Sequence, residues 1–151
     1  MVIRRKNGNL GNAGILKIRT IDKFLKMKLE HLKENAIAFY QMAFHGNPKE
    51  AVKRYVGAEY IQHNPAVANG TAGFVDYFER MQIEYPDKSI EFVRAIAEGN
   101  LVTLHTHQTW PGNDQYVTMD FFRFDENGKI VEHWDSIQQI PKESANPNTM
   151  Y

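Results

Sequence analysis

Two neighbouring segments near the C-terminus carry residue types that could transfer a proton. Strand-like alternation runs through residues 101–110 and 115–125, which are joined by a Pro-Gly-Asn-Asp turn. A four-residue loop and a two-residue loop centred on Gly-Asn predict the same antiparallel pairing, in which His105 lies opposite Asp120. Directly opposed residues share one face of a sheet, with Cβ atoms roughly 5 Å apart. The pattern therefore predicts an imidazole beside a carboxylate in the middle of a sheet.

The face predicted to carry this pair mixes imidazole, carboxylate, hydroxyl and aromatic side chains. Its candidate site residues are His105, His107, Tyr116, Thr118, Asp120 and Phe122. A carboxylate on a partly apolar wall has its charged form disfavoured, which raises its pKa and suits removal of a proton next to a carbonyl. Tyr116 and Thr118 could stabilise a developing oxyanion. The alternative is that His105 and Asp120 merely join two strands by a hydrogen bond.

The final strand, expected over residues 129–138, has two possible registers. A two-residue turn pairs Asp120 with Asp135, whereas a turn with a bulge at Gly128 pairs Asp120 with Trp134. The bulged register is favoured because two carboxylates would otherwise meet unshielded on a semi-apolar face. Trp134 would then form a flat apolar wall beside Asp120, and a purely structural core tryptophan is the alternative.

His63 is expected where a short strand over residues 59–63 meets a loop of small residues. A histidine at such a junction often lines a pocket mouth, and a histidine that caps the turn is the alternative. His63, His105, His107 and Asp120 could in principle supply metal ligands, but the spacing of the two strand histidines is not a recognised zinc motif. We therefore expect no metal site and no cofactor, and the sequence has no glycine-rich phosphate loop or nucleophilic-serine motif.

Composition narrows the class of protein. The chain has 151 residues, no cysteine and a formal net charge of zero. One domain without disulfides is predicted. Because the net charge is zero, the protein as a whole has no electrostatic attraction for nucleic acid or an anionic membrane. No apolar run approaches the roughly 20 residues of a membrane span, and charges within residues 15–21 exclude a signal-peptide core. We expect a cytoplasmic protein that binds neither nucleic acid nor membrane.

Helices are predicted before strands, as the apolar spacing, the caps and the turn residues indicate. The expected elements are helices over 28–45, 48–55 and 70–85, and strands over 59–63, 88–98, 101–110, 115–125 and 129–138. Helices followed by an antiparallel meander define an α+β fold. A curled sheet wrapped over the helices would leave a pocket between them. Residues 1–26 are expected to be a flexible or appended extension, 27–140 the domain, and 141–151 a surface tail.

Four motifs, in this order, resemble the SnoaL-like polyketide cyclase branch of the nuclear-transport-factor-2-like superfamily. They are YIQHNP at 60–65, LVTLHTH at 101–107, DFFRF at 120–124 and GKIVEHWD at 128–135. The resemblance covers about residues 29–140. It implies a cone-shaped α+β barrel in which a curved, mixed sheet wraps over the N-terminal helices around a deep apolar pocket. It also implies a homodimer formed through the outer face of the sheet.

The resemblance also implies a chemistry. In the characterised cyclases an aspartate on a central strand removes a proton during an intramolecular aldol closure, and a nearby histidine assists without metal or cofactor. By motif position these residues are Asp120 and His105, while His63 and Trp134 match recurrent pocket positions. We therefore expect a cofactor-independent enzyme, of aldol-cyclase or isomerase type, acting on a small apolar carbonyl compound. A non-catalytic dimeric module that binds a small ligand is the alternative, and a dimeric scaffold is a third reading.

Overall fold

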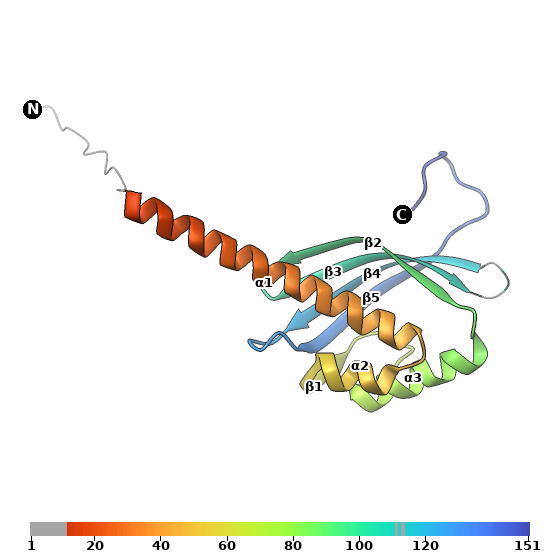
Figure 1. The fold of residues 1–151 in the computed structure, drawn as a ribbon. Coiled ribbons are helices and arrows are strands. Elements are labelled where there is room, and N and C mark those ends of the chain that lie inside the picture. Colours follow the sequence, from red (N-terminus) through yellow and green to blue (C-terminus); the bar gives the residue numbers. More distant parts are fainter. Residues whose placement is uncertain (1–11, 111, 113) are drawn as a thin grey trace, which may run out of the picture.

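The computed structural model describes residues 12–110, 112 and 114–151. Its helices are α1 (Asn12–Phe44), α2 (Pro48–Tyr55) and α3 (Gly70–Glu84), and its strands are β1 (Val56–Gln62), β2 (Ser89–Glu98), β3 (Leu101–Trp110), β4 (Asp114–Phe124) and β5 (Ile130–Gln139). The five strands form one sheet in the order β1-β5-β4-β3-β2. The helices lie along one face of the curved sheet, and the C-terminal segment lies on the other side (Figure 1). The predicted α+β fold is confirmed.

The sheet is mixed because one of its strand pairs is parallel. β1 pairs with β5 in parallel, whereas the three remaining neighbouring pairs are antiparallel, as hairpin turns require. α2 begins at Pro48, directly after Asn47, where a proline at the first helical position is favoured. β1 begins at Val56, earlier than predicted, so α2 passes into the sheet without a loop.

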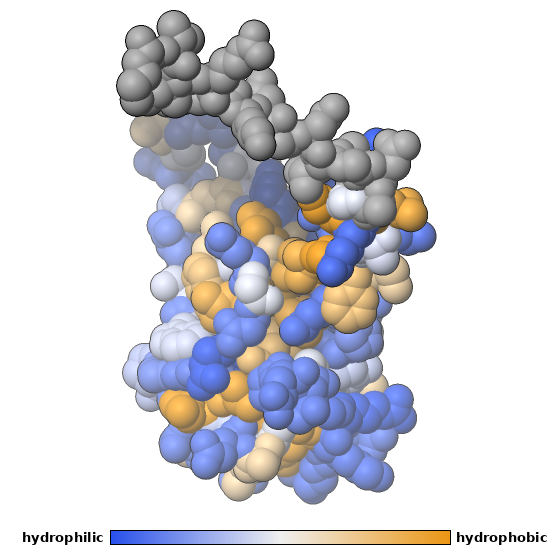
Figure 2. Space-filling model, turned by 90° about the vertical axis from the view of Figure 1, so that its left-hand side faces the viewer, coloured by the Kyte–Doolittle hydropathy of each residue, from blue (hydrophilic) through white to orange (hydrophobic). Residues whose placement is uncertain are grey.

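The first helix begins much earlier than its predicted start at residue 28. Leucine, lysine, arginine and methionine are frequent upstream of that position, and all four are strong helix formers. This part of α1 projects beyond the sheet (Figure 1), and Leu16 and Phe24 on it are largely exposed. Figure 2 views the molecule from this end and shows hydrophobic surface interleaved with hydrophilic surface. Among the described residues, no helix combines the length and apolar character that crossing a membrane would need.

The core lies between α1, α3 and the helix-covered face of the sheet. Phe39 on α1 stacks on Phe74 of α3 with ring centroids 4.7 Å apart, and it meets Phe122 of β4 edge-on at 6.1 Å. All three rings are fully buried. Aromatic contacts of this kind add to the free energy gained by burying the rings. The same face of the sheet carries the polar site described below.

The predicted register of β3 and β4 is wrong by one residue. Leu104, and not His105, lies opposite Asp120. Trp110 pairs with Asp114, so three residues separate the paired strands instead of two or four. Gly112, within this connection, has a φ of +82°, in the left-handed region that glycine adopts readily. Because side chains alternate along a strand, this slip moves every side chain of β3 to the opposite face.

Burial of apolar side chains favours the observed register. Val102 and Leu104 are fully buried on the helix-covered face, together with Phe122 of β4. In the predicted register Thr103 and His105 would have occupied that face. Burying a leucine or valine side chain is worth about 1.5–3 kcal/mol, so the observed register is strongly preferred.

The bulged register favoured for β4 and β5 is also wrong at the site. Asp120 pairs with Asp135, as the simple two-residue turn predicts. The bulged register holds only next to the turn, where Phe124 pairs with Ile130. An irregularity between Arg123 and Phe124 then shifts the pairing by one residue. Trp134 consequently lies on the outer face, away from Asp120.

The β3 register can be tested by truncating two leucines of this strand. Leu104 is 0% exposed and Leu101 is 40% exposed. Leu104→Ala should lower the free energy of unfolding by about 2–5 kcal/mol because it leaves a cavity in the core. Leu101→Ala, the matched control, should lower it by about 1 kcal/mol or less. Chemical denaturation measures both values, and equal losses would contradict the register.

Candidate active site

A cavity of about 300 Å³ lies between the helices and the sheet. One group of lining residues is aromatic: Tyr40, Phe44, Phe74, Tyr77, Phe78, Tyr85, Trp110 and Tyr116. A second group is polar: Gln62, Asn64, Gln108, Asp114, Thr118, Asp120, His133 and Asp135. A cavity with mainly apolar walls and a few converging polar groups is typical of a small-molecule site.

The centre of the polar group is a triangle of Tyr40, Asp120 and His133, from α1, β4 and β5. The Tyr40 hydroxyl donates to Asp120 Oδ1 at 2.6 Å and lies 2.7 Å from His133 Nε2. His133 Nε2 lies 3.1 Å from the same carboxylate oxygen. Asp120 is only 2% exposed. Burial, and then the nearby Asp120 carboxylate, raise the pKa of the Tyr40 hydroxyl well above its ordinary value, so it stays protonated.

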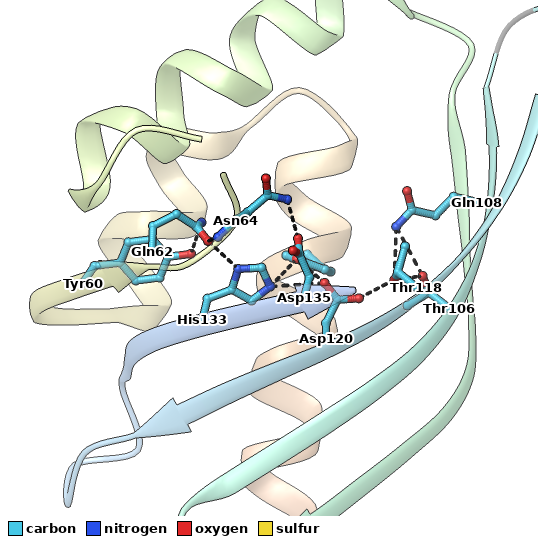
Figure 3. Close-up of polar contacts among 10 residues, drawn as sticks. Tyr60, Gln62, Asn64, Thr106, Gln108, Thr118, Asp120, His133 and Asp135 are labelled. Carbon is cyan, nitrogen blue, oxygen red and sulfur yellow. Dashed lines mark hydrogen bonds and ion pairs between the residues drawn. The ribbon is translucent and has the colours of Figure 1, made fainter. Parts of the chain in front are cut away.

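The neighbours of His133 fix where its ring carries a proton. The backbone N–H of Asn64 donates to Gln62 Oε1 at 2.9 Å, so this side-chain atom is an oxygen. His133 Nδ1 lies 3.0 Å from the same oxygen and must therefore donate to it (Figure 3). Nε2 then either accepts a hydrogen bond in the neutral ring or carries a second proton that Asp120 balances. In the protonated ring, the Nε2 proton would lie between the Asp120 carboxylate and the Tyr40 hydroxyl oxygen.

The other oxygen of Asp120 is held by the sheet itself. Thr118, two residues earlier on β4, donates its hydroxyl hydrogen to Asp120 Oδ2. Thr118 is in turn 2.7 Å from the hydroxyl of Thr106, directly opposite on β3. The Gln108 amide donates to Thr106 at 3.3 Å. Both oxygens of the buried carboxylate are therefore hydrogen-bonded.

Asp135 is the more accessible carboxylate of the site. It is half-buried, and Asn64 donates to its Oδ2 at 2.6 Å. Its other oxygen accepts no hydrogen bond from the described residues. Burial raises the pKa of Asp135 above its ordinary value and the charge of Asp120 adds to the rise, whereas the Asn64 hydrogen bond and His133 act in the opposite direction. This balance lets two carboxylates face each other in the register that the sequence argument disfavoured.

Asp120, His133 and Asp135 are also the described residues that could hold a metal ion. Their ligand atoms all lie within 4.8 Å of one another. An ion bound there would displace the contact of Tyr40 with His133 Nε2, which already satisfies this corner of the site. The earlier metal hypothesis, which combined His63, His105 and His107 with Asp120, is wrong because those histidines lie outside the cavity.

Of the candidate residues taken from the sequence, Tyr116, Thr118 and Asp120 line the cavity. Phe122 does not line it but supports the triangle from behind. Its ring meets Tyr40 edge-on at 4.9 Å and lies 4.8 Å from the His133 ring. Phe122 is therefore fully buried while it packs directly against the polar triangle.

The predicted pairing of His105 with Asp120 is wrong, because the slip of β3 puts His105 and His107 on the outer face. His105 Nδ1 accepts a hydrogen bond from Arg94 at 2.8 Å, and its Nε2–H donates to the backbone oxygen of Met150 at 3.1 Å. His107 stacks on Tyr151 with ring centroids 3.8 Å apart. Both histidines therefore contact the C-terminal segment and not the cavity.

His63 and Trp134 also lie outside the cavity. Their rings stack on each other with centroids 4.8 Å apart, and His63 Nε2 is 2.9 Å from Glu132. The expectation that they form a pocket mouth and a wall beside Asp120 is wrong. The neighbours of His63 in sequence, Gln62 and Asn64, are the residues that reach the site.

The sequence reasoning missed Tyr40, His133 and Asp135 as site residues. His133 and Asp135 share the face of Asp120 in the register that was considered and not favoured. Tyr40 lies within the helix predicted over residues 28–45, and its ring is buried in the core. A tyrosine among the core residues of a helix indicates a polar partner nearby, because a buried hydroxyl needs a hydrogen-bond partner.

Comparison with known proteins identifies the fold and a family. A family model of the SnoaL-like domain matches residues 36–133. A nuclear-transport-factor-2-like protein of unknown function from Burkholderia xenovorans LB400 has a TM-score of 0.65 and 19% identity, covering 79% of this chain and 91% of that one. A proposed polyketide cyclase from Bacillus cereus ATCC 10987 has a TM-score of 0.62 and 20% identity, covering 71% and 74%. TsrD from Streptomyces laurentii has a TM-score of 0.59 and 20% identity, covering 74% and 88%. No curated protein matches the sequence.

The raised pKa of Asp135 predicts a pH-dependent effect of Asp135→Asn on stability. The folded chain holds this proton at pH values where the unfolded chain has lost it, so stability falls as pH rises through the folded pKa. The amide that replaces this carboxylate would keep an oxygen for Asn64 and carry no charge. The variant should therefore have a higher melting temperature than the wild type at pH 8, with a difference that shrinks towards pH 4.

Asp76→Asn is the matched control, because Asp76 is exposed on α3. It should change the melting temperature little at either pH. If the melting temperature of Asp135→Asn at pH 8 were no higher than that of the wild type, burial would not be destabilising the charged form of Asp135.

Proposed function

Because the chain belongs to the SnoaL-like domain family, we propose that its cavity catalyses cofactor-independent acid–base chemistry on a small, largely apolar carbonyl compound. The observation that carries the proposal is the pair of carboxylates, Asp120 and Asp135, beside His133 in a cavity with aromatic walls. Groups whose surroundings separate their proton affinities are typical of acid–base sites.

Asp135 is the proton-transfer residue of the proposal. It has one oxygen without a protein partner among the described residues, and its raised pKa brings it closer to neutrality, where a general base works best. Its carboxylate removes a proton from a carbon next to the substrate carbonyl, and the electron pair of the C–H bond moves onto the carbonyl oxygen. The proton then returns to another atom, which gives an isomer. If the enolate carbon first attacks a second carbonyl, the proton goes to the new alkoxide, which gives an aldol product.

Asp120 and His133 hold the site in its working state. Asp120 accepts hydrogen bonds from Tyr40 and Thr118 and lies 3.1 Å from His133 Nε2, so its carboxylate is held in place beside Asp135. His133 thus takes the role that the sequence argument gave to His105. Tyr116 lines the same cavity about 13 Å farther along β4, so it contacts the other end of a bound ligand.

A non-catalytic binding module is the second candidate. The observation in its favour is that both oxygens of Asp120 are already hydrogen-bonded within the protein, as in a permanently structural carboxylate. Such a module would use Asp135 and Tyr116 only to orient a ligand. The two candidates differ in whether a bound ketone exchanges its protons faster than in water.

Proton exchange can be followed by NMR with 2-tetralone in deuterated buffer, because this apolar ketone has acidic hydrogens next to its carbonyl. The wild-type protein should accelerate the exchange, with a rate that rises with pH through the raised pKa of Asp135 and then levels off. Asp135→Asn should slow it by about 100-fold or more. Asp120→Asn should also slow it while changing ketone affinity only a few-fold.

Asp76→Asn serves again as the control and should exchange at the wild-type rate. Binding of 2-tetralone without any acceleration would refute the enzyme and favour the binding module. Unchanged exchange in Asp135→Asn would rule out Asp135 as the base.

We also propose a homodimer formed through the outer face of the sheet. The resemblance implies this arrangement, and the outer face of β4 exposes two apolar side chains, Met119 (40%) and Phe121 (44%). Sedimentation should therefore give twice the 17.5 kDa chain mass. Phe121→Asp should shift the protein to monomer, whereas Ile83→Asp, a control on an exposed part of α3, should not. A monomeric wild type at micromolar concentration would contradict the proposal.

A further inference from the structure

We propose that one end of the cavity is a subsite for an ammonium group, formed by the rings of Tyr85, Trp110 and Tyr116 together with Asp114. The inference rests on the proposed function for the other end of the ligand, where the carbonyl reacts. It narrows the substrate class to carbonyl compounds that also carry a positively charged amine. All four residues line the cavity, and Asp114 is exposed, which places the subsite at the opening.

The three rings form a corner around Trp110. The Tyr85 ring meets the Trp110 ring at 85° with centroids 5.3 Å apart, and the Tyr116 ring meets it at 87° and 6.3 Å. Because Tyr85, Trp110 and Tyr116 all line the cavity as well, a ligand group at this corner is next to all three rings. A cation is attracted to the faces of aromatic rings, most strongly to that of tryptophan, and aromatic cages hold quaternary ammonium groups.

The charges of the cavity favour the same ligand. Among the described residues, its lining contains Asp114, Asp120 and Asp135 but no lysine or arginine. Asp120 accepts hydrogen bonds from Tyr40 and Thr118 and lies beside His133, whereas from the described residues Asp114 accepts only a side-chain hydrogen bond of 3.3 Å from the neutral amide of Gln139. An anionic ligand would meet uncompensated negative charge, and a cation would complete the site.

The strand spacing defines the length of the ligand. Tyr116 and Asp120 point into the cavity from the same face of β4, four residues apart, which corresponds to about 13 Å along the strand. An ammonium group at the corner and a carbonyl at the carboxylates would thus be roughly 10 Å apart. On the sheet side Thr118 lies between them, whereas Tyr77, Phe78 and Met81 of α3 give the cavity an apolar wall, so the connecting part of the ligand can be largely apolar.

Three probes of nearly equal shape test the subsite without any chemistry: choline, 3,3-dimethylbutan-1-ol and 3,3-dimethylbutanoate. Their dissociation constants can be measured on the full chain by NMR titration at low salt. Choline should bind about tenfold more tightly than the neutral alcohol, and the anion should bind most weakly. Equal binding of choline and the alcohol, or tighter binding of the anion, would overturn the inference.

Two variants locate the effect. Trp110→Leu should abolish the preference for choline, and Asp114→Asn should weaken choline several-fold while leaving the alcohol unchanged. Because Asp114 is exposed, its variant should stay folded even if the tryptophan variant does not. Asp76→Asn is the charge-matched control and should bind all three probes like the wild type. An unchanged choline preference in Asp114→Asn would overturn the assigned location.

The outcome is separable from that of the proposed function. Loss of the choline preference with intact exchange of 2-tetralone would remove the ammonium subsite and leave the acid–base proposal standing. A retained choline preference without any ketone exchange would refute the acid–base proposal and leave the ammonium subsite standing, because choline binding involves no carbonyl chemistry.

Discussion

The hydrogen-bonded triangle of Tyr40, Asp120 and His133 is the constraint on which the site depends. It joins the first helix to two central strands by three contacts of 2.6 to 3.1 Å, all within the buried interior. A buried carboxylate is tolerated only where its charge is balanced and its oxygens are hydrogen-bonded. The helix therefore cannot slide along the sheet without leaving Asp120 unsatisfied. Fold and chemistry are specified by the same three side chains.

The sequence predicts the elements of this fold well because their periodicities are strong, but it does not set the strand registers. Asp120 was predicted as a site residue because it is a carboxylate on a partly apolar strand face, and its motif position agrees with that. Its partner was missed because a three-residue connection, and not a two- or four-residue one, joins β3 to β4. One residue of difference exchanges His105 for Leu104 opposite Asp120. Loop length is decided by the burial of the whole strand, which a local turn motif does not contain.

The second register error has a different physical origin. Asp135 opposite Asp120 was disfavoured because two close carboxylates repel each other, and that argument is correct for two charged groups. The structure relieves the repulsion by the raised pKa of Asp135 and by the neighbouring imidazole of His133. Under the proposed acid–base function, an arrangement that is unfavourable for stability is kept because proton transfer uses it. The rule that disfavours paired carboxylates in a sheet would then fail here for a functional reason.

The parallel pairing of β1 with β5 has a consequence for biosynthesis. β1 lies at the edge of the sheet, and its sole partner among the described strands is the last one in the chain. His133 and Asp135 lie on β5, so the ribosome synthesises the helices and the other four described strands before these two residues of the candidate site. Until then β4 has an open edge and the nascent chain leaves apolar helix faces uncovered, which is the stage at which aggregation competes with folding. Strand pairing between such distant segments also makes slow folding the expectation.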